Sequence, residues 1–239
     1  RVVRITSTNP ASPLDQVSYP DFDDLRKRAT VFDAVATSEP DGFTVDAHGG
    51  GQPRMTVGMI TSGDFFKVMR LQPVLGRAFG PDEDAVPDRS AVAVISGDLW
   101  QREFEGKSDV LGKTLRVNST EFTIVGVVPK DFRGMNLGGA TLRSDFYVPR
   151  MMMSALSDPS VHPLTERNNR NADVYGRLKA GVSIEQARME LASIGAQLEK
   201  ENPVTNRAES MTAYTQLGFL RAQRPLMEVG AFVFLFIGC

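Results

Sequence analysis

Residues 173–198 read DVYGRLKAGVSIEQARMELASIGAQL, and this stretch holds the clearest succession of a strand and a helix in the chain. Asp173 to Leu178 is a strand candidate that ends at an Ala-Gly turn, and Ser183-Ile184-Glu185-Gln186 has the form of a helix capping box. Apolar residues then recur at spacings of three and four: Ile184, Ala187, Leu191, Ile194 and Leu198. The pattern predicts an amphipathic helix packed on a sheet, ended by Asn202-Pro203 and followed by a last strand candidate at 211–217.

The first residues of the chain predict a similar unit. Arg1 to Ser7 is a strand candidate, and Ser18-Tyr19-Pro20-Asp21 combines a Ser cap, an early Pro and an acid, as at the start of a helix. Another strand candidate follows at 31–37. Two strand-helix-strand units at the ends of a chain can pair into one split β-α-β sheet, with the residues between them inserted as a second lobe. We therefore expect an α+β fold.

The residues between the two units predict a mixed sheet. The short apolar run at 91–95 is typical of a strand buried on both faces, and Ser96 is a suitable cap for a helix after it. The other predicted elements are strands at 55–60 and 145–149, a short helix opened by Thr61-Ser62-Gly63-Asp64, a Met-rich helical segment at 150–156 and a polar connector at 157–172.

Residues 114–118 and 121–128 form the clearest hairpin candidate, because two strand-like runs flank a short Ser-Thr turn. Alternation along the second strand predicts that Val128 shares a face with Phe122 and Ile124, while Val125 and Val127 lie on the other face. Apolar residues on both faces indicate that this sheet is covered on both sides.

The composition fits an ordinary globular protein with a sizeable core. The chain has 239 residues, of which 41% are hydrophobic and 23% charged, and a net charge of -2. Its basic residues are dispersed, which argues against a nucleic-acid surface, where Lys and Arg cluster to neutralise phosphates. The only cysteine is Cys239, so the sequence excludes an intrachain disulfide and a cysteine metal site and leaves the compartment open.

Residues 226–239 end the chain in an apolar run whose last part, Val229 to Cys239, carries no charge. A helix that spans a bilayer needs about 20 apolar residues, so this run alone fits equally a truncated membrane helix or a core element of a soluble domain. Since the chain also starts at Arg1 instead of a Met, we expect a segment of a longer protein, cut within a transmembrane helix.

A search for catalytic or binding motifs assigns no residue. His48 and His162 lie in polar, turn-rich stretches without a nearby acid, which favours surface positions over catalysis. No Ser lies in a G-x-S-x-G elbow, although a site assembled from distant residues stays possible on sequence alone. Gly49-Gly50-Gly51 lacks the Lys-Ser/Thr pair of a phosphate loop.

Three further motifs favour structural roles. The acids Asp82, Glu83, Asp84 and Asp88 do not fit the spacing of a calcium loop, and a flexible, solvated loop is the better interpretation. Asn118-Ser119-Thr120 matches a glycosylation sequon but occupies the predicted hairpin turn. Met151-Met152-Met153 point in different directions on a helix, which favours packing over metal binding. With no convergent polar cluster in view, we expect a binding, scaffolding or coupling domain without catalytic, cofactor-binding or metal residues.

Several ordered motifs resemble one known family. They are VGMITSGDFFKVM (57–69), LGRAF (75–79), AVAVIS (91–96), LWQREF (99–104), VLGKTL (110–115), FTIVGVVP (122–129) and VYGRLKAGV (174–182). In this order and spacing they resemble the periplasmic core domain of MacB-type ABC transporter permeases, the group that includes FtsX-like permeases. Each motif alone is a modest signal, but the ordered set is specific and covers nearly the whole chain.

The resemblance implies a periplasmic domain between the first two membrane helices of a bacterial inner-membrane permease. It implies a membrane-proximal, porter-like lobe made from 1–76 and 159–225, an inserted, sabre-like lobe at 77–158, and the start of a transmembrane helix at 226–239.

The resemblance also implies partners: a second permease copy in a homodimer or pseudo-dimer, a cytoplasmic ATPase that holds ATP and Mg on a separate nucleotide-binding domain, and a periplasmic adaptor or substrate protein. Its implied role is non-catalytic, coupling ATP hydrolysis to periplasmic movement for export or mechanotransmission. The alternative is a free-standing periplasmic or cell-surface binding module.

Overall fold

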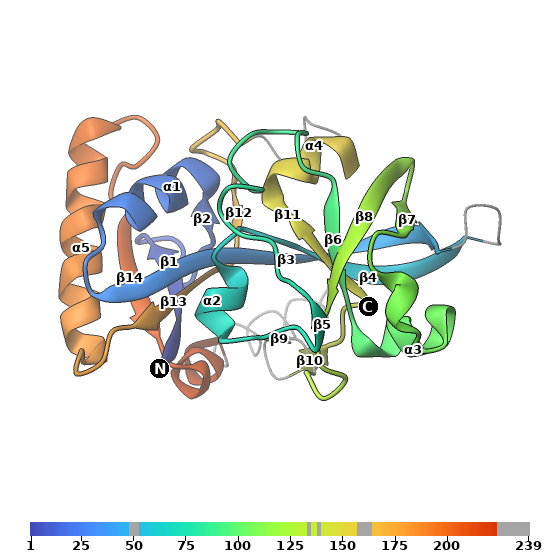
Figure 1. The fold of residues 1–239 in the computed structure, drawn as a ribbon. Helices are drawn as coiled ribbons and strands as arrows, with labels where there is room; N and C mark the ends of the chain where they lie inside the picture. Colours follow the sequence, from blue (N-terminus) through green and yellow to red (C-terminus); the bar gives the residue numbers. More distant parts are fainter. Residues whose placement is uncertain (48–52, 133–134, 138–139, 157–163, 224–239) are drawn as a thin grey trace, which may run out of the picture.

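The computed structural model describes residues 1–47, 53–132, 135–137, 140–156 and 164–223 (Figure 1). Its strands are β1 (Val2–Thr8), β2 (Val17–Ser18), β3 (Phe32–Asp46), β4 (Arg54–Thr61), β5 (Leu75–Gly76), β6 (Val92–Ile95), β7 (Thr114–Val117), β8 (Thr120–Val127), β9 (Met135–Leu137), β10 (Ala140–Leu142), β11 (Phe146–Pro149), β12 (Arg170–Ala172), β13 (Val174–Leu178) and β14 (Ser210–Tyr214). Its helices are α1 (Tyr19–Arg28), α2 (Phe65–Met69), α3 (Gly97–Phe104), α4 (Met153–Leu156) and α5 (Ile184–Glu201), with short 3-10 turns at Ser108–Val110 and Arg150–Met152.

One mixed sheet runs through the whole molecule. Its strand order is β14-β1-β13-β3-β4-β11-β6-β8-β5, and β7 pairs with both β3 and β8. The first strand of the chain lies between the last two, so the predicted pairing of the two ends in one sheet is confirmed. Figure 1 shows α5 at the β14 end of this sheet and α3 and β7 at the opposite end.

Both faces of the sheet are buried, because successive residues of its strands belong to different clusters of the core. On β13, Val174 packs in a cluster with α1 and α5, whereas Tyr175 packs in a cluster with α2. On β11, Phe146 packs with α3, whereas Tyr147 packs with α2. This alternation confirms the expected sheet with cover on both sides.

The local signals for helix starts are also confirmed. The Oγ atoms of Ser18 and Ser96 accept the N–H groups of Asp21 and Leu99 at 3.2 and 3.0 Å. Ser183 begins α5 with a complete capping box. Each cap satisfies amide groups that the first turn of a helix leaves unpaired.

Four sequence expectations need correction. The strand predicted at 31–37 continues to Asp46, because β3 gains a second partner in β4 after it leaves β13. The connector predicted at 157–172 includes β12, which pairs with β2. The last strand ends at Tyr214, and residues 216–223 are helical. In the parts of the chain that the structure describes, no helix is long and apolar enough to cross a membrane, and residues 226–239 lie outside them.

The fourth correction concerns the hairpin strand β8. Its pairing with β6 shifts register between Ala93 and Val94, which leaves Val125 without a partner in the ladder. This irregularity reverses the alternation, so Val127 shares a core cluster with Phe122 and Ile124, and Val128 packs with the α2 cluster instead. A bulge of this kind inserts one residue and moves every later side chain to the other face.

Candidate functional site, a buried polar junction

The structure assigns structural roles to two of the sequence motifs, the Asn118 sequon and the three consecutive methionines. The side chain of Asn118 is engaged in the fold: its Nδ2 donates to Leu156 O and its Oδ1 accepts from Thr44 N–H. Met151, Met152 and Met153 are buried in the core, as expected for packing residues. His48, His162, Gly49-Gly50-Gly51 and Cys239 lie outside the described residues. Within the described residues, no group of three acidic, His or Cys side chains could hold a metal ion.

The centre of the sheet contains a junction that sequence patterns do not reveal. At Thr37 the strand β3 still pairs with Val174 of β13, and one residue later Ser38 pairs with Thr61 of β4. Two bonds fix this exchange of partners: Thr37 N–H donates to Ser62 Oγ at 3.0 Å, and Ser62 N–H donates to Thr37 O at 3.1 Å. The two parts of the sheet are therefore joined through a single continuous strand at a defined residue.

A buried ion pair lies beside this exchange point. Arg150, which directly follows β11, is only 1% exposed, and its Nη1 donates to the carboxylate of Glu39 on β3. The guanidinium carbon also lies 5.2 Å from the ring centre of Tyr19 at the start of α1. A buried charge is costly unless an opposite charge and hydrogen bonds compensate it. The contacts of Arg150 with Glu39 and Tyr19 therefore hold three distant segments of the chain together.

The acidic loop contributes the side chain of Asp84 to the junction. Its carboxylate accepts the N–H of Gly63, just before α2, at 3.0 Å, and the N–H of Met151 at 2.9 Å. The side chain is buried, with 2% of the residue exposed. The expectation of a solvated loop is wrong for this residue, because Asp84 turns inward while Asp82 and Asp88 stay exposed.

Burial governs the protonation of the three acidic groups in this junction. It raises the pKa of Glu39 to about 7, against the opposing charge of Arg150, and it raises the pKa of Asp84 to about 6, against the hydrogen bonds from Met151 and Gly63. Burial and the charge of Asp84 raise the pKa of Tyr19 to about 12. The junction can therefore take up protons near neutral pH, where ordinary carboxyl groups are fully ionised.

Several polar atoms around the exchange point have no hydrogen-bond partner among the described residues. They are Thr37 Oγ1, Ser38 Oγ, Thr61 Oγ1 and Arg150 Nε. Buried polar atoms that lack partners cost stability, so these four atoms offset part of what the hydrogen bonds of the junction contribute.

A second polar cluster fixes the segment before β12. Asp21 is fully buried, and its carboxylate accepts from Arg167 at 2.6 Å, Asn206 at 2.9 Å and Arg170 at 3.3 Å. These partners stand 146 to 185 positions away in the chain. The expectation that the chain holds no convergent polar cluster is thus wrong. Neither cluster presents an activated nucleophile, and both act by holding distant segments together.

The sequence matches a known protein family. The sequence profile of a family described as "MacB-like periplasmic core domain" matches residues 1–194. A search of curated proteins found no match.

Solved structures with a similar fold point in the same direction. The periplasmic region of MacB from Actinobacillus actinomycetemcomitans superposes with a TM-score of 0.61 at 14% identity, covering 95% of this chain and 92% of that one. The extracellular domain of the noncanonic ABC-type transporter YknZ from Gram-positive bacteria gives a TM-score of 0.59 at 15% identity, covering 90% of this chain and 100% of that one. At these identities the likeness establishes the fold.

Proposed function

This chain belongs to the family of MacB-like periplasmic core domains of ABC transporter permeases, and on that premise we propose that it is a non-catalytic coupling domain. In this proposal a cytoplasmic ATPase, which holds ATP and Mg on its own nucleotide-binding domain, drives movement of the membrane helices. The periplasmic domain carries that movement to a substrate or adaptor protein, for export or for mechanotransmission.

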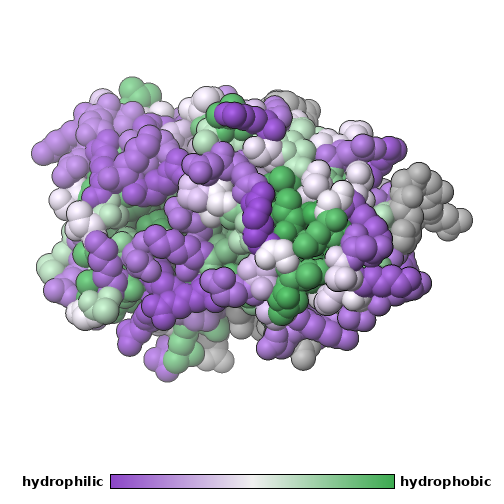
Figure 2. Space-filling view, viewed as in Figure 1, coloured by the Kyte–Doolittle hydropathy of each residue, from purple (hydrophilic) through white to green (hydrophobic). Residues whose placement is uncertain are grey.

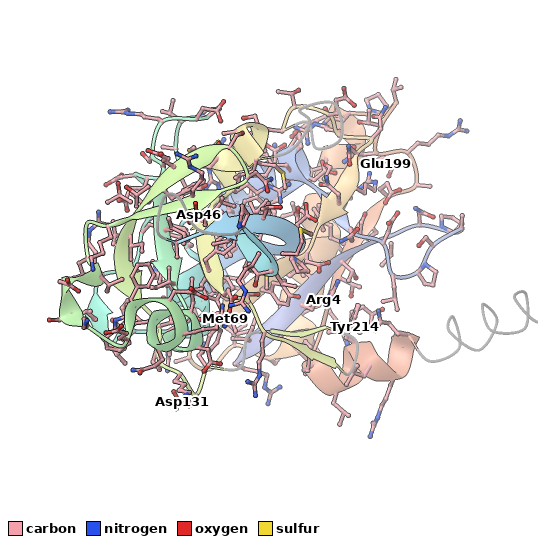
Figure 3. All side chains as sticks on the ribbon, turned by 90° about the vertical axis from the view of Figure 1, so that its right-hand side faces the viewer. Arg4, Asp46, Met69, Asp131, Glu199 and Tyr214 are labelled. Atoms are coloured by element: carbon pink, nitrogen blue, oxygen red, sulfur yellow. The ribbon has the colours of Figure 1, made fainter. Side chains whose placement is uncertain are left out.

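The observation that carries the proposal is the closeness of the first strand, β1, to the end of β13 and to residues 214–219. Leu178 N–H donates to Arg1 O at 2.9 Å, so the end of β13 lies beside the start of β1. Arg4 of β1 pairs with Tyr214 of β14, and its guanidinium lies 4.1 Å from the ring centre of Phe219 (Figure 3). Two segments that lie side by side in this way suit attachment to two neighbouring membrane helices, and we propose that residues 226–239 begin the second.

The sheet provides a path for movement away from these segments. Strand β14 is bonded to β1, β1 to β13 and β13 to β3, which continues into the part of the sheet made by β4 and β11. A displacement of the chain ends therefore reaches the far part of the molecule through β3. The Glu39–Arg150 pair lies beside the residue at which β3 changes partner, which makes it the natural control point of the coupling.

The division into lobes is part of the same proposal. Residues 1–76 and 159–225 would form the porter-like lobe and 77–158 the inserted lobe. One core cluster supports the porter-like lobe: the cluster under α1 and α5 draws almost wholly on the two ends of the chain, with Met151 the exception. The cluster under α3 draws on residues 43–156, because the second half of β3 reaches into it.

Coupling also requires a second permease copy, because a single domain has nothing to move against. We propose a homodimer or pseudo-dimer in which two such domains approach and separate on the periplasmic side of the bacterial inner membrane.

The test uses the full permease, reconstituted with its ATPase in lipid nanodiscs. Cys239 is changed to Ser, and a spin label is placed at Met189→Cys, an exposed position on α5. Pulsed electron resonance then measures the distance between the labels of the two copies. The proposal expects different distances in the ATP-bound and nucleotide-free states, and a single unchanged distance would refute it.

A further inference from the structure

Four basic residues gather where α2 and β13 end. Lys67 and Arg70 belong to the last turn and the C-terminal cap of α2, and Arg177 and Lys179 lie at the end of β13. Arg177 Nε donates to Val68 O at 2.6 Å, which holds the two elements together. We call these four residues the basic surface.

Two charges of this surface, those of Arg70 and Arg177, repel each other. Burial and then the positive charge of Arg70 lower the pKa of Arg177, which indicates that the two guanidinium groups are close enough to interact. Two acids lie near the surface without an ion pair to it within 4 Å. Asp33 acts on Arg177 through its charge, and Glu190, whose carboxylate accepts hydrogen bonds from Thr30 and Val31, is acted on by the charge of Lys179.

Three of the four cations are exposed and unpaired. Among the described residues, Lys67, Arg70 and Lys179 form no ion pair within 4 Å. Several other exposed cations of the chain are paired. Arg116, for example, lies 2.7 Å from Glu121, and Lys107 lies 2.5 Å from Glu105. The basic surface thus keeps an excess of positive charge in a protein whose net charge is -2.

The basic surface also lies beside the first strand of the chain. Arg177 pairs with Val2 in the ladder between β13 and β1. Figure 3 places Met69, Arg4 and Tyr214 toward one side of the molecule and Glu199 toward the other, and Figure 2 shows hydrophilic residues over the region where α2 and the N-terminus lie in Figure 1. The helical residues 216–223 next to them expose Leu217, which is 59% accessible.

We propose that Lys67, Arg70, Arg177 and Lys179 form a docking surface for the anionic phospholipid head groups of the bilayer that holds the permease. The inference rests on the proposed function, which turns this end of the domain toward the membrane. Lys and Arg attract anionic lipid head groups at short range, with Leu217 available for apolar contact at the interface. By holding the domain to the lipid surface, these contacts would set its resting orientation.

The experiment measures partition of the full chain between buffer and vesicles by flotation. One set of vesicles is pure phosphatidylcholine, and the other also contains the anionic lipid phosphatidylglycerol. The apolar end of the chain should bind both sets, so the informative quantity is the ratio of the two partition coefficients. We expect a preference for anionic vesicles that weakens as sodium chloride is added.

The test variant is Lys67→Gln/Arg70→Gln/Lys179→Gln, which spares Arg177 because of its bond to Val68. At about fivefold in binding per cation, removal of three should reduce the preference by up to roughly a hundredfold. The matched control is Arg89→Gln/Lys200→Gln/Arg207→Gln, which removes the same charge from exposed positions elsewhere. We expect the control to keep the preference, and unchanged circular dichroism melts would show that both variants fold.

Three outcomes would overturn the inference: equal partition of the unmodified chain into both vesicle sets, a test variant that keeps its anionic preference, or a control that loses as much. These results are independent of the proposed function. A permease whose labels respond to ATP while the chain shows no anionic preference would refute only the lipid surface. A permease that shows the preference without any response to ATP would refute only the coupling role.

Discussion

The guanidinium of Arg150 donates a hydrogen bond to the carboxylate of Glu39, and the two residues stand 111 positions apart in the chain. The arginine follows β11 and the acid lies on β3, next to the residue at which β3 passes from β13 to β4. The pair lies on the β4 side of this exchange, where Glu39 is opposite Ile60, and the guanidinium reaches the other part of the molecule through the ring of Tyr19, which packs in the cluster under α1 and α5.

Removal of Arg150 should destabilise the chain, because it leaves the carboxylate of Glu39 buried without its charge partner. We predict that Arg150→Met lowers the free energy of unfolding by about 3 kcal/mol, the low end for a broken buried pair, because Glu39 can take up a proton in compensation. Urea denaturation of the chain measures the effect. The double variant Glu39→Gln/Arg150→Met should recover part of the loss, and an Arg150→Met chain as stable as the unmodified one would contradict the account.

The raised pKa values of the junction predict an unusual dependence of stability on pH. In the folded chain, burial raises the pKa of Glu39 to about 7 and that of Asp84 to about 6, whereas both groups titrate near pH 4 when unfolded. Because the folded chain keeps these protons to higher pH, the free energy of unfolding falls as pH rises from about 4 to about 7 and then levels off.

Denaturation curves between pH 5 and pH 8 test this trend. The unmodified chain should lose on the order of 2 kcal/mol over this interval, and Glu39→Gln should lose clearly less, because the neutral amide cannot titrate. The carboxyl groups with lowered pKa values, such as Glu83 and Glu190, lose their contribution only at lower pH. Stability that stays level or rises from pH 5 to pH 8 in the unmodified chain would count against this prediction.

Asp84 should matter far more than its neighbour in the same acidic loop. Asp84→Ala leaves the buried N–H groups of Gly63 and Met151 without an acceptor, and we predict a loss of about 2–4 kcal/mol. The control Asp82→Ala changes an exposed carboxylate and should cost less than about 0.5 kcal/mol. Thermal melts monitored by circular dichroism distinguish the two, and equal effects would show that Asp84 is not the anchor of the loop.

The cluster around Asp21 predicts a local effect. Asp21→Ala removes the acceptor of Arg167, Arg170 and Asn206, and hydrogen exchange should then accelerate in residues 164–172 before it does so in α5. Asp23→Ala, on the more exposed side of α1, serves as the control and should leave the exchange of that segment unchanged. Uniform acceleration across the whole chain would mean that the cluster has no local role.

The parts of the fold that depend on local signals could be predicted from the sequence. The capping box at Ser183, the cap at Ser96 and the stripe of α5 all rest on residues within a few positions of one another. The second half of β3 could not, because it contains Pro40 and Gly42, and only pairing with β4 makes it a strand. The reversal of faces at Val125 likewise depends on pairing with another strand.

The candidate site escaped prediction for a related reason. Asp84 is one of several acids in one loop, and nothing near it in sequence marks it as the one that turns inward. Arg150 and Glu39 carry no motif, and their pairing appears only when β11 and β3 are brought to the same place by the sheet. Buried ion pairs between distant segments leave no periodic trace, whereas amphipathic helices do.

The central claim is that movement at the chain ends crosses the junction to the far part of the sheet. In the reconstituted permease, the distance between the two copies is measured with labels at Met189→Cys on α5 and, separately, at Met55→Cys on β4. The account predicts that ATP changes both distances in the unmodified permease, and that Arg150→Met keeps the change at the first position and loses it at the second. An undiminished change at Met55→Cys in the Arg150→Met permease would contradict it.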